Sequence, residues 1–191
     1  TLMEIAGQCD GLRCDMAMLM MNSIFERTWG SRTASKPEAE YWPLITSTVK
    51  KRFSGFKFVA EAYWDLEWEL QQHGFDYCYD KRLYDRLEHD WAESVGLHLC
   101  ADLNYQEKLV RFIENHDEPR AAATFHLQKH RVAALTALTL PGARLVHEGQ
   151  LEGRRVRVPV FLCRRPEEAP EREIIGFYEQ LFRALRSSEF I

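Results

Sequence analysis

Three short stretches of the chain each end an apolar run on an acidic residue. In order, they are Gly11 to Asp15, Phe58 to Glu61 and Phe112 to Asp117. Strand-like runs that end on acids, with helices between them, predict a barrel rim where several strands present acids to one pocket. Three carboxylates that meet in one pocket are suited to breaking a glycosidic bond. We therefore take Asp15, Glu61 and Asp117 as candidate catalytic residues.

The neighbours of these acids fit the same chemistry. Arg13 and Asp15 are two residues apart on a predicted strand, so they face the same side. A guanidinium beside a carboxylate balances its charge and fixes its orientation, which suits a nucleophile. Asn115 and His116 immediately precede Asp117 and can donate hydrogen bonds to sugar hydroxyls.

Aromatic and additional acidic residues lie near the candidate acids. Tyr63 and Trp64 follow Glu61, and they either stack on a sugar ring or pack in the core. Glu114 and Glu148 are weaker candidates for a place in the site. We expect Glu118 and Arg120 to begin the next helix and to brace the loop.

The elements that must position these residues alternate between strand and helix about five times, which is typical of a parallel sheet. The expected strands cover residues 11–14, 56–60, 75–79, 109–113 and 143–147. The expected helices cover residues 2–6, 37–54, 65–72, 84–91, 103–108, 122–138 and 171–185. No glycine-rich phosphate loop follows any strand, which argues against a nucleotide-binding fold.

Local signals give three further expectations. Residues 22–36 contain Trp29-Gly30-Ser31 and Lys36-Pro37, so they predict a loop rich in turn formers. Pro37 and the acids after it favour the start of a helix. Asp65 is expected to cap the helix that follows it.

Composition narrows the class of protein. The chain has 191 residues, 46% of them hydrophobic, and a formal net charge of -4. Mild acidity argues against a nucleic-acid partner. The basic groups Lys50-Lys51-Arg52, Arg154-Arg155 and Arg164-Arg165 are separated in the sequence, and we interpret them as solvated surface.

Cysteine and histidine spacing predicts neither a disulfide framework nor a metal site. The five cysteines have no metal-type spacing, and a reduced, cytoplasmic setting is expected. His126 and His130 are four residues apart, but no glutamate stands where a zinc protease requires one. No apolar run is long enough to cross a bilayer, so no membrane partner is expected.

The residues carry a family resemblance. Gly11, Arg13 and Asp15 match the G-x-R-x-D motif at the fourth strand of the α-amylase family (glycoside hydrolase family 13). Other matches to that family are the glutamate and aromatic pattern of Phe58 to Asp65, N-H-D at Asn115-His116-Asp117, and L-P-G followed by G-Q at Leu140 to Gln150. The chain therefore resembles the C-terminal portion of that family's catalytic barrel.

The resemblance implies an α/β fold, a partial (β/α)8 TIM barrel of about strands 4–8 with their helices. It implies a single partial catalytic barrel domain over residues 1–191, which lacks strands 1–3 and the loop domain after strand 3. The missing partner would be the N-terminal half of its own barrel. Lacking three strands, the isolated chain is expected to be inactive and prone to aggregate.

The resemblance also implies roles for the residues. Asp15 would be the nucleophile, Glu61 the acid/base and Asp117 the transition-state stabiliser, with Arg13 and His116 orienting an oligosaccharide or α-glucan. Met18 and Leu19 stand where many members carry a lysine–histidine pair, which puts the usual substrate preference in question. Calcium is common in the family, but its usual ligands lie largely in the absent part, so no cofactor is predicted.

The implied function is a retaining α-glycoside hydrolase or transglycosylase that works through a covalent glycosyl-enzyme intermediate. The alternative is a non-catalytic amylase-like barrel that serves as a binding or partner subunit. The presence of all three acids favours the enzyme.

Overall fold

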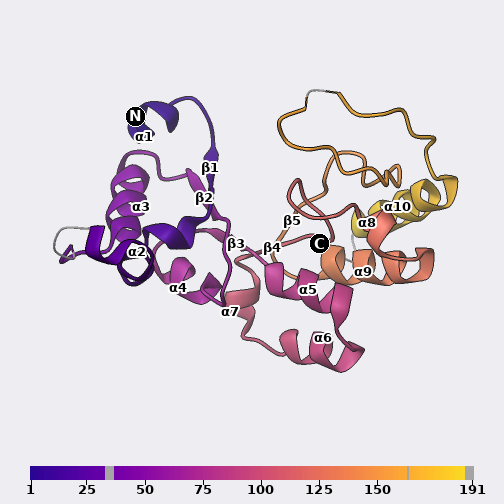
Figure 1. Ribbon diagram of the computed structural model, residues 1–191, viewed down its shortest axis with the longest axis horizontal. Coiled ribbons are helices and arrows are strands. Elements are labelled where there is room, and N and C mark those ends of the chain that lie inside the picture. Colours follow the sequence, from indigo (N-terminus) through magenta and orange to yellow (C-terminus); the bar gives the residue numbers. More distant parts are fainter. Residues whose placement is uncertain (33–36, 163, 188–191) are drawn as a thin grey trace. The chain divides into compact units, whose positions relative to one another are not determined.

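The computed structural model describes residues 1–32, 37–162 and 164–187 (Figure 1). Its five strands are hydrogen-bonded in their sequence order. They are β1 (Gly11–Cys14), β2 (Lys57–Ala60), β3 (Tyr77–Tyr79), β4 (Leu109–Arg111) and β5 (Ala143–Arg144). The pairs β1–β2, β2–β3 and β3–β4 are parallel. Parallel neighbours require a crossover between them, and helices supply much of these connections.

The helices follow the strands in alternation, as the sequence predicted. They are α1 (Leu2–Ile5), α2 (Asn22–Trp29), α3 (Tyr41–Arg52), α4 (Glu67–Gln72), α5 (Lys81–His89), α6 (Ala92–His98), α7 (Leu103–Gln106), α8 (Ala121–Thr124), α9 (Leu127–Thr139) and α10 (Arg172–Leu185). Two short 3-10 turns are η1 (Ala17–Met20) and η2 (Gly30–Arg32).

The chain forms two compact units. Unit 1 comprises Thr1–Arg82 and Ala101–Val110, and unit 2 comprises Leu83–Cys100 and the chain from Arg111 onward. The organisation of residues 1–191 as a single partial barrel domain stays a prediction.

The core of unit 1 is built from β2 and the helix that precedes it. Phe58 of β2 is fully buried, and Trp42 of α3 packs edge-on against Phe75 with ring centroids 4.8 Å apart. The Trp42 indole N–H donates to the Ala17 carbonyl at 2.7 Å, so this large side chain is also satisfied as a donor. This packing anchors the segment that follows β1.

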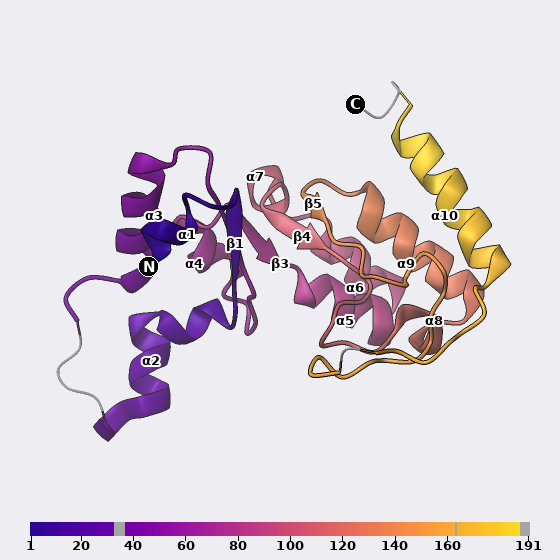
Figure 2. The ribbon, with the colours of Figure 1, turned by 90° about the horizontal axis from the view of Figure 1, so that it is seen from above.

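The core of unit 2 lies between α9 and α10, which run side by side (Figure 2). Small residues Ala133 and Ala137 on α9 are buried, and they face a cluster that includes Ile174, Tyr178 and Leu181 of α10. The helix expected over residues 171–185 is confirmed by α10, and these three residues are its buried positions.

The expectation of a loop over 22–36 is wrong for its first part, because α2 occupies Asn22–Trp29. The Asn22 backbone N–H donates to the Glu40 carboxylate at 3.0 Å, and its side chain donates to the carbonyls of Pro37 and Ala39. These partners are distant in the sequence, so local turn signals could not reveal them. Residues 33–36 lie outside the described residues.

Two predicted helix starts are also wrong. Helix α3 begins at Tyr41 rather than at Pro37. Helix α4 is preceded by Leu66, whereas Asp65 has a left-handed φ of 61° and pairs with Arg82.

The helix expected over 122–138 is interrupted. It divides into α8 and α9, since the His126 ring accepts a hydrogen bond from the Lys129 backbone N–H at 3.4 Å and caps α9. In the described part of the chain, no helix is both long and apolar enough to cross a membrane.

Candidate active site

Arg13 links two of the candidate acids in unit 1. Cys14 of β1 lies opposite Ala60 of β2, so the residues that directly follow the two strands emerge together at one edge of the sheet. The Nη1 atom of Arg13 pairs with Asp15, and Nη2 lies 2.8 Å from Glu61 Oε1. Asp15 is exposed and Glu61 is buried. One guanidinium thus separates a solvent-facing carboxylate from an enclosed carboxyl group.

The backbone after Asp15 also holds Glu61. Met16 has a left-handed φ of 42°, and its N–H donates to Glu61 Oε2 at 2.7 Å. The Ala17 N–H donates to the Glu61 carbonyl, and the Glu61 N–H donates to the Cys14 carbonyl, both at 3.0 Å. A non-glycine residue in this conformation is strained, and strain of this kind is found where a structure fixes functional groups.

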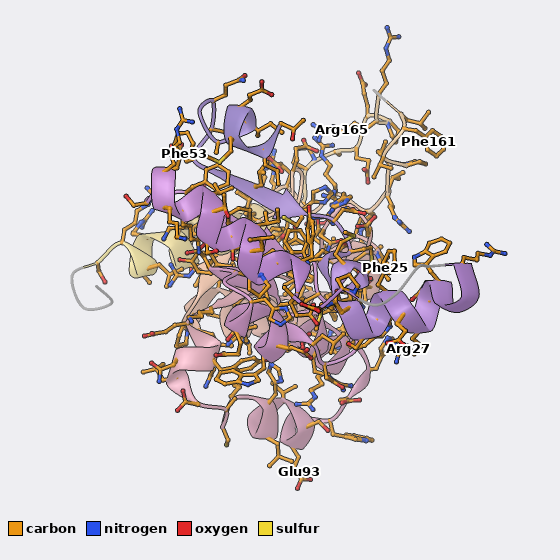
Figure 3. The ribbon with its side chains drawn as sticks, turned by 90° about the vertical axis from the view of Figure 1, so that its left-hand side faces the viewer. Phe25, Arg27, Phe53, Glu93, Phe161 and Arg165 are labelled. Atoms are coloured by element: carbon orange, nitrogen blue, oxygen red, sulfur yellow. The ribbon has the colours of Figure 1, made fainter. Side chains whose placement is uncertain are left out.

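The two aromatic candidates have different surroundings. The Tyr63 hydroxyl lies 3.4 Å from Glu61 Oε1, within reach of a hydrogen bond. Trp64 is 55% exposed, and the guanidinium of Arg27 lies 5.7 Å from the centre of its indole ring; Figure 3 shows Arg27 on α2. An exposed indole beside the acids offers a surface for a sugar ring.

Sequence reasoning missed Tyr79. The guanidinium of Arg13 lies 5.6 Å from the centre of the Tyr79 ring. Tyr79 ends β3, so its position at the end of a strand was the signal that could have found it.

In unit 2, Asn115 folds the loop that carries His116 and Asp117. Asn115 is buried, and its side-chain oxygen accepts from the backbone N–H groups of Asp117 at 2.8 Å and Glu118 at 3.0 Å. His116 Nε2 lies 2.9 Å from Asp117 Oδ2, and both side chains are 42% exposed. The geometry gives Asn115 a positioning role, whereas His116 and Asp117 are accessible to a ligand.

Glu114 is the most enclosed acid of this loop. It is 0% exposed, and its carboxyl accepts from the Ala121 backbone N–H at 2.6 Å. Its other oxygen lies 3.0 Å from Arg120 Nη2 and 3.2 Å from His147 Nδ1. Burial raises the pKa of Glu114 to about 7, although the Ala121 N–H and Arg120 favour the charged form.

Arg120 connects this loop to the one after β5. It precedes α8, and its guanidinium donates to the Glu148 carbonyl at 2.8 Å and lies 2.9 Å from His147 Nδ1. The expected bracing role of Arg120 is therefore confirmed. Burial and the charge of Arg120 lower the pKa of His147. A guanidinium can only donate hydrogen bonds, so the Nδ1 atom of His147 accepts from Arg120. An Nδ1 atom that accepts has a favourable contact with the Glu114 carboxyl group when that group is protonated.

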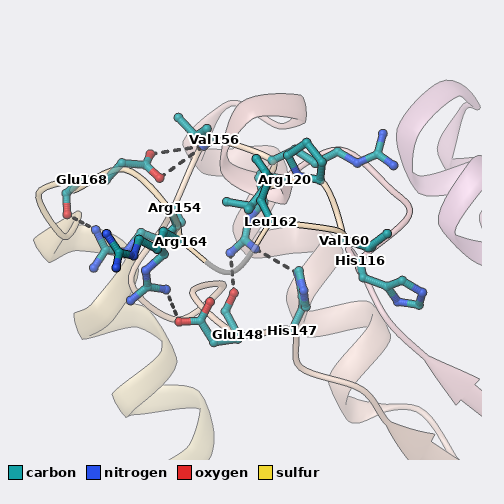
Figure 4. A pocket seen from close by; sticks show the side chains of 14 residues that line it. His116, Arg120, His147, Glu148, Arg154, Val156, Val160, Leu162, Arg164 and Glu168 are labelled. Carbon is teal, nitrogen blue, oxygen red and sulfur yellow. Dashed lines mark hydrogen bonds and ion pairs between the residues drawn. The ribbon is translucent and has the colours of Figure 1, made fainter.

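An open cavity of about 500 Å³ lies beside these groups in unit 2 (Figure 4). We call it the arginine cavity. Its lining is His116, Arg120, His147, Glu148, Arg154, Val156, Arg157, Val158, Pro159, Val160, Leu162, Arg164, Arg165 and Glu168. The sequence interpretation placed the basic pairs at the surface; it did not reveal that arginines from separate stretches gather around one cavity.

Within residues 1–32, 37–162 and 164–187, no group of three or more His, Cys, Asp or Glu side chains is placed to hold a metal ion. Four cysteines, Cys9, Cys14, Cys78 and Cys100, are free thiols, and Cys163 lies outside the described residues.

Comparison with known sequences identifies a relative of the chain. The chain is 28% identical over 156 residues to alpha-amylase MalA of Haloarcula japonica. The match covers 78% of this chain but only 21% of that protein, so the chain spans about a fifth of the relative it matches. The chain resembles the α-amylase family. No family model matches it.

Solved structures show the same fold. A debranching enzyme from Nostoc punctiforme superimposes with a TM-score of 0.70 at 17% identity, covering 96% of this chain and 42% of that one. An α-amylase from Lactobacillus plantarum superimposes with a TM-score of 0.58 at 20% identity, covering 84% of this chain and 39% of that one. A cyclic α-maltosyl-(1→6)-maltose hydrolase from Arthrobacter globiformis superimposes with a TM-score of 0.64 at 17% identity, covering 96% of this chain and 44% of that one. The predicted α/β fold, a partial (β/α)8 barrel, is confirmed.

Proposed function

We propose that the full-length protein is a retaining glycosidase or transglycosylase that acts on α-glucosidic bonds of an oligosaccharide or α-glucan. The similarity to a protein named as an α-amylase supports the reaction class. The observation that carries the proposal is the position of Arg13 between Asp15 and Glu61. Two carboxyl groups that contact one guanidinium are close enough to act on the same glycosidic bond, as the proposed retaining mechanism requires.

The exposures of the two acids suit two different roles. Asp15 faces solvent, so an incoming sugar can reach it, and Arg13 fixes its orientation. We assign Asp15 as the nucleophile. Glu61 is enclosed and held by the Met16 N–H, so its carboxyl is aimed rather than free to rotate. We assign Glu61 as the general acid and base.

The remaining candidate residues would bind the sugar, stabilise the transition state or orient Glu61. Asp117, paired with His116, would face the positive charge that develops on the sugar ring, while His116 would donate to a hydroxyl group. Tyr63 would keep Glu61 oriented, and the exposed face of Trp64 would stack on a sugar.

The reaction would have two steps. Asp15 attacks the anomeric carbon and forms a glycosyl ester while Glu61 gives its proton to the leaving oxygen. Glu61 then takes a proton from water or an acceptor hydroxyl, whose oxygen attacks the same carbon and releases Asp15. Two inversions return the original α configuration.

Two substitutions in the full-length protein test these roles. We expect Glu61→Gln to lower kcat on maltooligosaccharides by roughly 10²–10⁴-fold, and Asp15→Asn to lower it at least as much, because each removes a group that reacts. Asp10→Asn is the matched control, since Asp10 precedes β1 at the strand's opposite end and is exposed. Turnover of the Asp15→Asn variant near that of the control would defeat the assignment, as would a β-anomer as the first product in a proton NMR time course.

A further inference from the structure

The lining of the arginine cavity has more arginines than carboxylates. Five arginines and two glutamates, Glu148 and Glu168, line it, in a chain whose formal net charge is -4. Even when buried Glu114 is counted against Arg120, arginines outnumber carboxylates by two. Residues 153–166 contain five arginines and no acid, so the excess is local to this segment.

The two acids of the lining are already engaged. Glu148 pairs with Arg165. The carboxylate of Glu168 accepts from the backbone N–H groups of Arg155 at 2.8 Å and Val156 at 3.2 Å. The Glu168 bonds hold the loop that carries the arginines and leave the guanidinium charges in place, whereas Glu148 compensates only that of Arg165. Neither Arg157 nor Arg164 has an ion-pair partner among the residues that the structure describes.

The backbone is shaped to admit two of the arginines. Gly149 has a φ of +84°, and a Cβ atom there would lie 2.7 Å from Arg120 Nη2 and 2.6 Å from Arg154 Cγ. Only glycine tolerates both this conformation and this close approach. In Figure 4, Arg154, Arg164 and Glu168 lie at one end of the cavity and His116 at the other, with Arg120, His147 and Glu148 between them.

An anion with several oxygen acceptors fits these donors. A guanidinium presents a planar fork of N–H donors that matches phosphate in a bidentate manner. The volume of about 500 Å³ is that of a small-molecule site and far exceeds the need of a bare phosphate. Apolar residues, among them Val156, Val158 and Val160, also line the cavity and can pack against the C–H face of a sugar ring.

His116 belongs both to the lining of this cavity and to the proposed sugar-binding residues of unit 2. It lines the cavity, and its Nε2 atom lies 2.9 Å from the carboxylate of Asp117. We propose that the arginine cavity binds the phosphate group of a phosphorylated sugar, which therefore serves as a substrate or acceptor of the enzyme. This inference rests on the proposed function for the sugar part of the ligand, but phosphate binding can be measured without turnover.

Calorimetric titration of the full-length protein tests the proposal with four probes: glucose 6-phosphate, glucose 1-phosphate, inorganic phosphate and glucose. We expect at least one sugar phosphate to bind at least about tenfold more tightly than inorganic phosphate and glucose, because it uses both the arginines and the apolar wall. Equal affinity for sugar phosphates and glucose would overturn the proposal. Equal affinity for sugar phosphates and inorganic phosphate would overturn its sugar part.

Arginine variants locate the binding. The Arg157→Gln/Arg164→Gln double variant should weaken sugar phosphate binding by about tenfold or more, since it removes two charged donors from exposed positions. Arg155→Gln is the matched control, because Arg155 lies on the same loop but does not line the cavity. Loss of affinity in the control equal to that in the double variant would place the anion elsewhere.

The two proposals fail in different ways. A protein that binds sugar phosphates but cleaves no α-glucoside would refute the proposed function and keep the phosphate site. If the protein cleaves neutral maltooligosaccharides through Asp15 but does not distinguish glucose from its phosphates, only the proposal of a phosphate site in the arginine cavity is refuted. In Figure 3, Phe161 and Arg165 extend from the cavity loop, so Phe161→Trp provides an additional fluorescence readout of phosphate binding.

Discussion

Glu61 of unit 1 and Glu114 of unit 2 are held in nearly the same way. Each carboxyl is buried, accepts one backbone N–H, from Met16 at 2.7 Å or Ala121 at 2.6 Å, and lies within 3.0 Å of an arginine nitrogen. The arginines differ in what else they contact. Arg13 is partly exposed and reaches the solvent-facing Asp15, whereas Arg120 is buried and reaches the His147 ring and the Glu148 carbonyl.

This difference shows how one motif serves two purposes. In unit 1 the buried glutamate and its arginine hold a second carboxylate at the surface, that of Asp15, the proposed nucleophile. In unit 2 the same pair connects two loops, and the loop itself orients Asp117, the proposed stabiliser of the transition state. We therefore expect substitutions of Arg13 to affect catalysis first, and substitutions of Arg120 to affect stability first.

Arg120→Met should have the largest effect on stability. It leaves Glu114 buried without its charge partner, and breaking a buried pair from one side typically costs about 3–5 kcal/mol. Hydrogen exchange followed by mass spectrometry on the full-length protein would show faster exchange in α8 and α9. Peptides from α3 in unit 1 provide an internal reference.

Arg13→Met is the matched comparison for that experiment. Arg13 retains 26% of its side-chain exposure, so its loss should cost markedly less stability, while kcat falls. If Arg13→Met accelerates exchange in unit 1 as much as Arg120→Met does in unit 2, the proposed difference between the two arginine–glutamate pairs is wrong.

Glu114→Gln should change how stability depends on pH. Burial raises the folded-state pKa of Glu114 to about 7, above an unfolded value of about 4.3. The folded state therefore binds this proton more tightly. The stability that this proton contributes is fully present below about pH 4 and is lost as pH rises from there through about 7, for a total of at most about 4 kcal/mol.

The charged neighbours set the control for this experiment. Arg120, His147 and Glu148 face Glu114, and the lowered pKa of His147 contributes with the opposite sign, because stability is then lost as pH falls below the unfolded value. The difference between wild type and Glu114→Gln isolates the glutamate. Parallel stability curves for the two proteins from pH 4.5 to 7.5 would contradict the raised pKa.

Sequence patterns revealed the strand ends better than the contacts between them. The runs 11–14 and 57–60 are apolar, short and followed by acids, so the edge that carries Asp15 and Glu61 could be predicted. The ion pair of Arg13 with Asp15 followed from two-residue alternation and is confirmed. Its simultaneous contact with Glu61 depends on the register of β1 against β2, which no local pattern specifies.

The parts that could not be predicted depend on partners far apart in the chain. Helix α2 is anchored by contacts between Asn22 and residues 37–40. Glu114 meets His147, which is 33 positions away, and its only signal in the sequence was an acid inside an apolar run. The arginine cavity likewise combines Arg120 with arginines that lie 34 or more positions further along the chain, namely Arg154, Arg157, Arg164 and Arg165.

Asn115→Ala should have the smallest of these effects, about 1–2 kcal/mol of stability. It removes the acceptor of two N–H bonds at 2.8 and 3.0 Å, which fold the loop around Asp117. Unit 1 has no such dependence, because Asp15 is oriented by the Arg13 side chain. Asn115→Asp keeps an oxygen acceptor and should retain the loop, so hydrogen exchange of the Asp117 and Glu118 amides should accelerate only in the alanine variant. If the aspartate variant exchanges as fast as the alanine variant, then Asn115 acts through its own contact with a ligand or neighbour, and the orientation of Asp117 by the loop is refuted.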